Sequence, residues 1–302
     1  MSSKKIPVIL DTDIGGDIDD TWALAMLINS PELDLKLVTT SSNDPLFGAK
    51  IVGKLLDRAG RPDVQIGLGI NTQDRYGYGY GNQKLWIEGY DLYTRKGVDN
   101  DGVGRLIKTI MDSPEKITVL AIGPLHNVYE ALNREPRIAD KARFVGMHGS
   151  IHLGYGGAAK PDAEWNVVAD PYSCREVFKA PWEVTITPVD TCGLIVLEGE
   201  YMRRIKASEK PLAKAVIENY SAWLGDNIAT LNVENKSSTL FDTVAVYLAF
   251  SEELLNIEEL PIKVTYNGFT QIDEKQPKKI RCATSWKDME AFNKLLTDRI
   301  IV

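Results

Sequence analysis

Five aspartates within ten residues are the densest group of side chains in this sequence that could do chemistry. They surround the pair Gly15-Gly16 and follow the apolar run Val8–Leu10, a pattern that predicts a buried strand, a turn and the start of a helix. Carboxylates this close repel one another strongly, so at neutral pH they need a cation or shared protons. The five are Asp11, Asp13, Asp17, Asp19 and Asp20.

The spacing of these aspartates brings their oxygens together. Residues two apart on a strand point to the same face, so Asp11 and Asp13 converge. Asp19 and Asp20 fall at the start of the expected helix Thr21–Asn29, where the helix dipole favours carboxylates. An all-oxygen ligand set suits Ca²⁺ or Mg²⁺ rather than zinc. Helix capping or a turn explains one or two aspartates, Asp17 first among them, but not five.

The elements that must position these acids alternate between strand and helix. Such alternation, with strands rich in Val, Ile and Leu, predicts βαβ units and a mostly parallel sheet. Strands are expected at 6–13, 35–40, 64–68, 117–122, 142–147 and 184–188, and helices at 21–29, 47–59, 103–111, 125–133, 171–178, 202–207, 211–225 and 243–250.

The C-terminal part of the chain follows a different pattern. Residues 262–282 alternate like antiparallel strands around an Asn267-Gly268 turn, and a last helix is expected at 285–300. We therefore expect one α/β domain over residues 1–302. It would have a Rossmann-like, mostly parallel central sheet, flanking helices and a small C-terminal antiparallel extension.

Ligands of such sheets bind beyond the carboxyl ends of the strands. The residues expected at that edge are largely polar and acidic, which suits a sugar-and-cation site. They are Asp11, Asp13, Asn43, the segment after Ile122, His148 and Asp190.

Composition restricts the class of protein. The net charge of −7 argues against a nucleic-acid partner, and no run of eighteen apolar residues predicts a membrane helix. The N-terminus lacks the apolar region of a signal peptide. Three widely spaced cysteines form neither a disulfide framework nor a CxxC site. Together these features predict a cytoplasmic protein kept in a reducing compartment.

Two long segments have the composition of functional loops. Residues 73–101 carry Tyr78, Trp86 and four further tyrosines among glycines, and residues 226–240 are polar. Long loops within a compact domain commonly act as lids. An aromatic, glycine-rich loop could stack on a planar base; ordinary surface packing of the aromatics is the alternative.

Several segments together resemble the calcium-dependent nucleoside hydrolases, the inosine-uridine-preferring nucleoside N-ribohydrolase family. That family has a DxDxGxDD strand–helix junction, which here spans Asp11–Asp20 with two extra residues in the turn. Later segments match in order: Thr39–Asn43, Ala121–Asn127, Ala163–Pro171 (the family's AEFNxxxDP) and Asp242.

The resemblance implies an enzyme of nucleoside salvage that hydrolyses the N-glycosidic bond of ribonucleosides through an oxocarbenium-like transition state. One Ca²⁺ would lower the pKa of a water and chelate the ribose diol. The enzyme would be a homodimer or homotetramer. The implied metal ligands are Asp11, Asp13, Asp20, Asp242 and the Ile122 carbonyl, with Asp13 as general base. The implied ribose contacts are Asp19, Asn43, Glu164, Trp165 and Asn166.

The base side departs from the best-studied members of the family. Phe241 stands where they have a His before the final aspartate, and His148 replaces a Gly. Base contacts are therefore expected from His148, Tyr78, Trp86 and Phe241, although His148 could equally be a hydrogen-bonded structural residue. Aromatic stacking would favour purines.

Two other classes of protein are alternatives to a nucleoside hydrolase. A haloacid-dehalogenase-like phosphohydrolase also begins with DxD, but neither the Asp19-Asp20 pair nor the Ala163–Asn166 segment fits it. A non-catalytic riboside-binding protein is the other class, and the complete set of acids argues against it. A hydrolase of a modified nucleoside also remains open.

Overall fold

The central feature of the fold is a nine-stranded sheet in which every neighbouring pair but one is parallel. The computed structural model describes residues 4–42, 44–72, 82–225 and 235–302. The strand order is β4-β3-β2-β1-β5-β6-β7-β11-β8, and only β8 runs antiparallel to its neighbour. The strands are β1 Ile6–Thr12, β2 Leu33–Thr40, β3 Gln65–Leu68, β4 Val98–Asp99, β5 Ile117–Ala121, β6 Ala142–Met147, β7 Val184–Thr187, β8 Leu255–Leu260 and β11 Ile280–Trp286.

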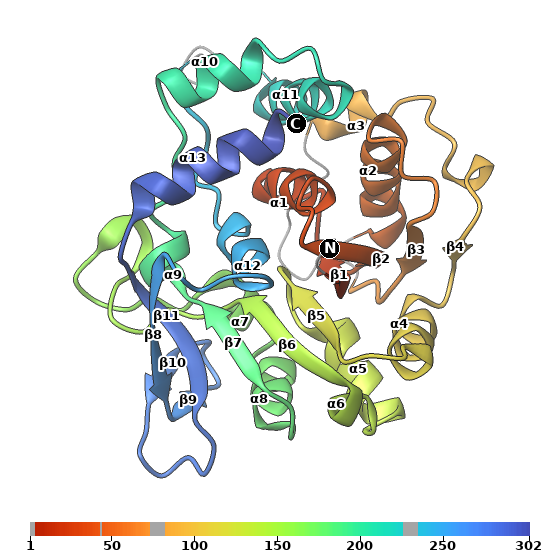
Figure 1. Cartoon of the computed structure of the whole chain (residues 1–302). Helices are drawn as coiled ribbons and strands as arrows, with labels where there is room; N and C mark the ends of the chain where they lie inside the picture. The colour runs from red at the N-terminus through yellow and green to blue at the C-terminus, as the bar shows by residue number, and fades with distance from the viewer. Residues whose placement is uncertain (1–3, 43, 73–81, 226–234) are drawn as a thin grey trace.

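Helices cover both faces of this sheet, and a hydrophobic core lies on each face (Figure 1). One core holds the side chains of α1 Asp19–Ile28, α2 Pro45–Arg58, α3 Gln83–Trp86, α10 Glu200–Lys206, α11 Pro211–Leu224, α12 Thr243–Leu248 and α13 Met289–Ile300. The other holds those of α4 Gly102–Asp112, α5 His126–Arg134, α6 Ile138–Lys141 and α8 Pro171–Lys179. None of the described helices is long and apolar enough to cross a membrane.

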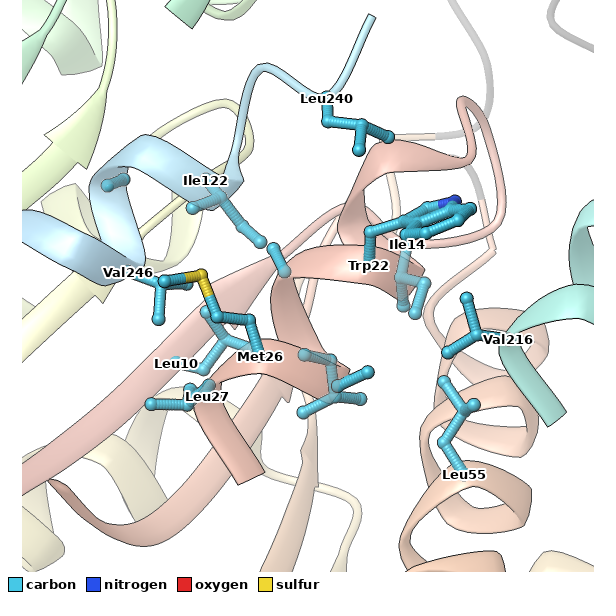
Figure 2. Close-up of a cluster of buried hydrophobic side chains, with 14 of the residues drawn as sticks. Leu10, Ile14, Trp22, Met26, Leu27, Leu55, Ile122, Val216, Leu240 and Val246 are labelled. Carbon is cyan, nitrogen blue, oxygen red and sulfur yellow. The ribbon is translucent and has the colours of Figure 1, made fainter. Parts of the chain in front are cut away.

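Helix α1 is held in place by burial on nearly all sides. Figure 2 shows Trp22 and Met26 of this helix among side chains of β1, α2, α11 and α12. The Trp22 ring meets Tyr220 of α11 edge to face, with centroids 5.8 Å apart. A helix packed on so many sides cannot move without loss of apolar contact. The first turn of α1, which carries Asp19 and Asp20, is therefore fixed at the carboxyl end of β1.

The C-terminal region differs from the sequence-based expectation. A separate antiparallel hairpin exists, but it contains only β9 (Ile262–Val264) and β10 (Thr270–Ile272), joined through Gly268 at a φ of +83°. Strand β11 instead joins the main sheet between β7 and β8. The last helix begins at Met289 rather than at residue 285. Pairing of β11 with β8 continues to Trp286, and the Asp288 carboxylate caps the helix by accepting the Ala291 N–H.

Candidate functional site

A cavity of about 900 Å³ opens at the carboxyl ends of the central strands. Its walls come from the β1–α1 turn, the loops after β2, β3, β5 and β6, the segment from Ala163 to Tyr172, and the start of α12. Among the predicted site residues, those lining it are Asp13, Asp19, Asp20, Ile122, Glu164, Trp165, Asn166, Phe241 and Asp242. The fold thus gathers segments from most of the chain around one cavity.

Three buried carboxyl groups form the acidic floor of the cavity. Asp19, Asp20 and Asp242 are 5%, 3% and 3% exposed, and each offers an oxygen within 4.8 Å of the others. Asp242 occupies the N-cap position of α12 but makes no capping hydrogen bond; its carboxyl group instead shares a hydrogen bond with that of Asp19. Burial, reinforced by the neighbouring carboxylates, raises the pKa of all three well above the usual range. Without a cation, these groups therefore hold protons.

Asp13 lies beside this cluster, at the end of β1. The β5–α5 loop packs directly on it: a Cβ atom on Gly123 would lie 2.6 Å from Asp13 Oδ1 and 2.8 Å from its backbone nitrogen. Burial, with the added charges of Asp11 and Asp17, raises the pKa of Asp13 to about 7. A carboxylate with a pKa near neutrality is suited to taking a proton from water.

Asp11 lies beneath the cavity rather than on its wall. It is fully buried, and its Oδ1 accepts hydrogen bonds from Thr39 Oγ1 (2.5 Å) and Asn127 Nδ2 (2.8 Å). Its Oδ2 has no hydrogen-bond partner in the described part of the chain. Burial raises the pKa of Asp11 to about 6, although the Thr39 and Asn127 bonds oppose this. Asn127, which also binds the Thr40 carbonyl and the Ile70 N–H, was not predicted as a site residue.

Asp17 is exposed at the rim of the cavity. Its Oδ1 accepts the Ile18 backbone N–H at 2.7 Å, as expected for a turn residue. Asp17 lines the cavity, and its charge adds to that of the buried acids, but its own side chain is exposed and bonded within the turn.

Hydrogen bonds to backbone groups hold the side chains of Glu164 and Asn166, two of the residues expected to contact ribose. Glu164 caps α7 (Trp165–Ala169) and accepts N–H groups from Gly149, Asn166 and Val167 at 2.8 to 3.2 Å. Burial nevertheless raises the pKa of Glu164 to about 7. Asn166 donates through Nδ2 to the carbonyls of Ile122 and Met147 at 3.2 and 3.0 Å. The Ile122 carbonyl therefore faces the polar part of the cavity.

Two aromatic side chains meet on another part of the wall. The rings of Phe241 and Tyr155 lie edge to face at 5.8 Å, and the Tyr155 hydroxyl accepts the Trp165 backbone N–H at 2.9 Å. Tyr155 was not predicted from the sequence, where only its position in a Gly-rich segment marks it. Together the two rings give the cavity an aromatic, largely apolar section of wall next to its polar floor.

Two expected base contacts lie away from the cavity. His148 is fully buried, and its Nε2 pairs with the Gly123 carbonyl at 3.1 Å beneath the loop. Burial lowers its pKa to about 3, so it is a neutral structural residue and not a polar group of the site. Trp86 lies on α3 and packs against α11, with its indole N–H 3.2 Å from Glu218. The expectation that these two side chains face a base is corrected, because burial in the protein interior holds both of them away from it.

Asp190 also lies off the cavity, although the sequence placed it on the ligand edge. It accepts the backbone N–H groups of Ile151, His152 and Leu153 and so organises the loop after β6. The predicted contacts Asn43 and Tyr78 lie outside the described residues.

The composition of the acidic floor fits a hard divalent cation. Every donor there is an oxygen, and the three clustered carboxyl groups are close enough to share one ion. The raised pKa values and the unpartnered Asp11 Oδ2 mark a site that lacks positive charge. The residues present therefore fit such a cation, with Asp13 and the Ile122 carbonyl at its border.

The amino-acid sequence matches known enzymes along nearly its whole length. The model of the inosine-uridine preferring nucleoside hydrolase family matches residues 8–294. An inosine-uridine preferring nucleoside hydrolase from Crithidia fasciculata is 26% identical, covering 97% of this chain and 96% of that protein. The pyrimidine-specific ribonucleoside hydrolase RihA of Citrobacter koseri is 30% identical, over 70% of this chain and 69% of the relative.

A solved structure of similar fold is also named as a nucleoside hydrolase. The solved structure of a plant nucleoside hydrolase superposes with a TM-score of 0.82 at 20% identity, covering 99% of this chain and all of that one. The substrates in the relatives' names include both purine and pyrimidine nucleosides, so those names do not decide which base this cavity accepts.

Proposed function

The chain belongs to the inosine-uridine preferring nucleoside hydrolase family, which hydrolyses ribonucleosides to base and ribose, and we propose that it does so in the acidic cavity with Asp13 as general base. The observation that carries this proposal is the position of Asp13. Its carboxyl group lines the cavity beside the buried Asp19, Asp20 and Asp242, where it can reach a water held at the acidic floor. At neutral pH it can take a proton from a water that attacks the anomeric carbon.

The remaining polar residues would hold the sugar. Asp19 accepts a ribose hydroxyl at the floor, and Asn166 and Glu164 bind further hydroxyls from the opposite wall, with Trp165 packed against the sugar. Asn43 belongs to the same proposed contact set. Fixing the sugar in this way favours the flattened, positively charged ring of the transition state, which the surrounding carboxylates stabilise.

A divalent cation completes the proposed site, and Ca²⁺ is its expected identity. Asp11, Asp13, Asp20, Asp242 and the Ile122 carbonyl would hold it. When bound, it supplies charge neutralisation and polarises water and the ribose diol. Carboxylate and carbonyl oxygens in an irregular arrangement suit Ca²⁺ better than the strictly octahedral Mg²⁺.

The aromatic wall supports a preference for purines. Phe241 and Tyr155 line the cavity with aromatic rings set edge to face, and the face of a single ring can pack against a base, with more contact area for a purine than for a pyrimidine. The deciding experiment measures ribose release from purine, pyrimidine and modified ribonucleosides with Ca²⁺, and again with EDTA. Release that depends on Ca²⁺ supports the hydrolase. Equal rates on inosine and uridine would contradict the purine preference, and no release from any substrate would favour a riboside-binding protein.

Replacement of Asp13 tests the assignment of the base. We expect Asp13→Asn at saturating Ca²⁺ to lower kcat on the best nucleoside by about 10²- to 10⁴-fold, the usual contribution of a general base. Its thermal unfolding midpoint in EDTA should stay the same or rise, because a buried acid with a raised pKa is removed. The matched control is Asp34→Asn, which removes an exposed carboxylate paired with Lys36 at the opposite end of the sheet. Full activity of Asp13→Asn would exclude Asp13 as the base.

The proposal extends to the assembly and location of the protein. The family resemblance supports a homodimer or homotetramer, which the mass of the purified protein measured by light scattering would test. All three cysteines are free and buried, which supports residence in a reducing compartment such as the cytoplasm.

A further inference from the structure

A histidine–aspartate pair lies on the wall of the cavity and has no role in the mechanism above. His126 is the first residue of α5, and Asp170 lies between α7 and α8. His126 Nδ1 and Asp170 Oδ2 are 2.6 Å apart, and both residues line the cavity. Their side chains are 15% and 20% exposed, so the pair is partly buried yet open to the cavity.

Asp170 is held so that it can orient the ring. As the N-cap of α8 it accepts the Ser173 N–H at 3.0 Å and the Ser173 hydroxyl at 2.5 Å. Although burial alone would raise it, hydrogen bonds from His126 and Ser173 hold the pKa of Asp170 below its usual value. An ionised Asp170 accepts a hydrogen bond from Nδ1–H, so a second proton on the ring would sit on Nε2, and it is this proton that the imidazolium could give up. Within the described ranges of the chain, no hydrogen bond engages Nε2.

The charged groups that act on or contact His126 are carboxylates. Asp170 contacts it directly from α8, and Asp11 and Asp13 of the β1 end act on it at longer range, since His126 lowers the pKa of both. Other groups nearby are occupied with one another. Tyr129 and Tyr172 pair at 3.4 Å, and Arg134 on the same helix pairs with Glu130.

The two other histidines of the chain do not share this setting. His148 is sealed beneath the β5–α5 loop, and His152 is exposed with its Nε2 near Glu258, at 3.3 Å. Neither lines the cavity. Phe241 at the start of α12 offers no proton. Among the described residues, the His126–Asp170 pair is therefore the only imidazole with access to the cavity.

We propose that His126 donates a proton from Nε2 to the departing base and that Asp170 is its positioning residue; this rests on the hydrolase function proposed above. As the bond between the base nitrogen and the anomeric carbon breaks, its electron pair leaves with the base. The base takes the Nε2 proton on a ring nitrogen. Water adds to the anomeric carbon, and its proton goes to Asp13. Proton exchange with solvent then restores both residues.

The test compares two substrates that differ in their need for this proton. One is inosine, whose base leaves poorly as an anion. The other is 4-nitrophenyl β-D-ribofuranoside, whose nitrophenolate leaves without protonation. His126→Asn keeps an amide near the position of Nδ1, so the Asp170 bond survives while Nε2 is removed. Asp170→Asn keeps a capping oxygen on α8 but removes the charge. His152→Gln is the matched control.

We expect His126→Asn to lower kcat on inosine by about 10²- to 10⁴-fold and kcat on the nitrophenyl riboside by less than about 5-fold. Any fall of kcat on inosine with rising pH that His126 causes should be absent in this variant. Asp170→Asn should lower kcat on inosine by about 10-fold, and His152→Gln should match the unaltered protein. Thermal unfolding of each variant, measured in parallel, reports folding.

Unchanged inosine turnover in His126→Asn would overturn the proposal. An equal loss on both substrates would also overturn it, because the pair would then only tie α5 to α8. If the unaltered protein released ribose from neither substrate, the proposed hydrolase function would fail and this proposal with it. If the unaltered protein releases ribose from both substrates, the hydrolase function is supported regardless of how the variants behave.

Discussion

Carboxyl groups that repel one another are kept together here by burial on a rigid frame. Asp19 and Asp20 sit in the first turn of a helix packed on several sides, and Asp242 begins a second helix beside it. The frame forces the groups to hold protons when no cation neutralises them. The site is therefore a set of buried carboxyl groups whose charged forms repel one another, and a bound cation would reduce this repulsion.

Substitution of one clustered carboxyl group should separate binding from folding. We expect Asp242→Asn to keep or raise the thermal unfolding midpoint in EDTA, because it removes a buried acid from a repelling set. The rise in midpoint on adding Ca²⁺ should be lost. At 100 times Kd, that rise corresponds to about 2.7 kcal/mol of unfolding free energy in a protein that binds normally. The measurement is differential scanning calorimetry with and without Ca²⁺.

Asp17→Asn is the matched comparison, since Asp17 is an exposed rim carboxylate that already accepts the Ile18 N–H. This variant should retain the Ca²⁺ response. Loss of the response in Asp17→Asn but not in Asp242→Asn would show that the cation binds at the rim rather than on the floor.

Elements position the site through close backbone approach as well as through side chains. The β5–α5 loop lies against Asp13 with no space for a Cβ atom at Gly123. The strands that bring these loops together could be predicted from sequence. β1, β2, β5, β6 and β7 are apolar runs buried on both faces, and such runs predict parallel strands on their own.

What the sequence could not predict depends on partners distant in the chain. The strand character of β11 is set by β7 and β8 on either side of it, so local alternation indicated only an antiparallel hairpin. The acids of the β1–α1 turn were found because they are adjacent in sequence. His126 and Asp170, or Tyr155 and Phe241, meet only through tertiary packing. Trp86 was expected to contact a base, but its side chain packs against α11, a helix distant from it in the sequence.

Gly123→Ala should reduce activity more than stability. The added methyl group must displace the Asp13 carboxylate or move the loop, so we expect kcat on the best nucleoside to fall by about 10-fold or more, as small misplacements of catalytic groups do. Gly60→Ala is the contrasting variant. Nothing lies within 4 Å of its Cβ position, but its φ of +66° is unfavourable for alanine. It should lower the unfolding free energy by about 1 kcal/mol and leave kcat unchanged. Equal kcat for the two variants would contradict the close approach at Gly123.

The protonated acids also affect the whole molecule, through the pH dependence of its stability. Burial raises the pKa of Asp11 to about 6, and those of Asp13 and Glu164 to about 7, from unfolded values of 3.8 and 4.5. Between about pH 4 and pH 7 the folded protein therefore binds more protons than the unfolded chain. Its free energy of unfolding should then fall as pH rises through this window, although the buried His148, whose pKa is lowered to about 3, opposes the trend with a single proton.

This fall can be measured by urea unfolding in EDTA at a series of pH values from about 4.5 to 8. We expect the midpoint to decrease with rising pH. Saturating Ca²⁺ should flatten the curve, because the cation replaces the protons. Exposed acids with lowered pKa, such as Asp63 and Asp112, act below this window and do not oppose the trend. A midpoint that rises from pH 5 to pH 7 in EDTA would show that the cluster is not protonated in the folded protein.

The acidic floor joins the start of the chain to a helix near its end, and this sets when the floor can exist during folding. Asp20 and Asp242 come together only after the intervening βαβ units have formed and α12 has docked on α1. Contacts of such long sequence separation carry a high loop-closure cost, so we expect this one to form late in folding. A cation that needs both acids would then bind after the rate-limiting step of folding. It should leave the folding rate unchanged and slow unfolding, because it stabilises the folded state and not the transition state of folding.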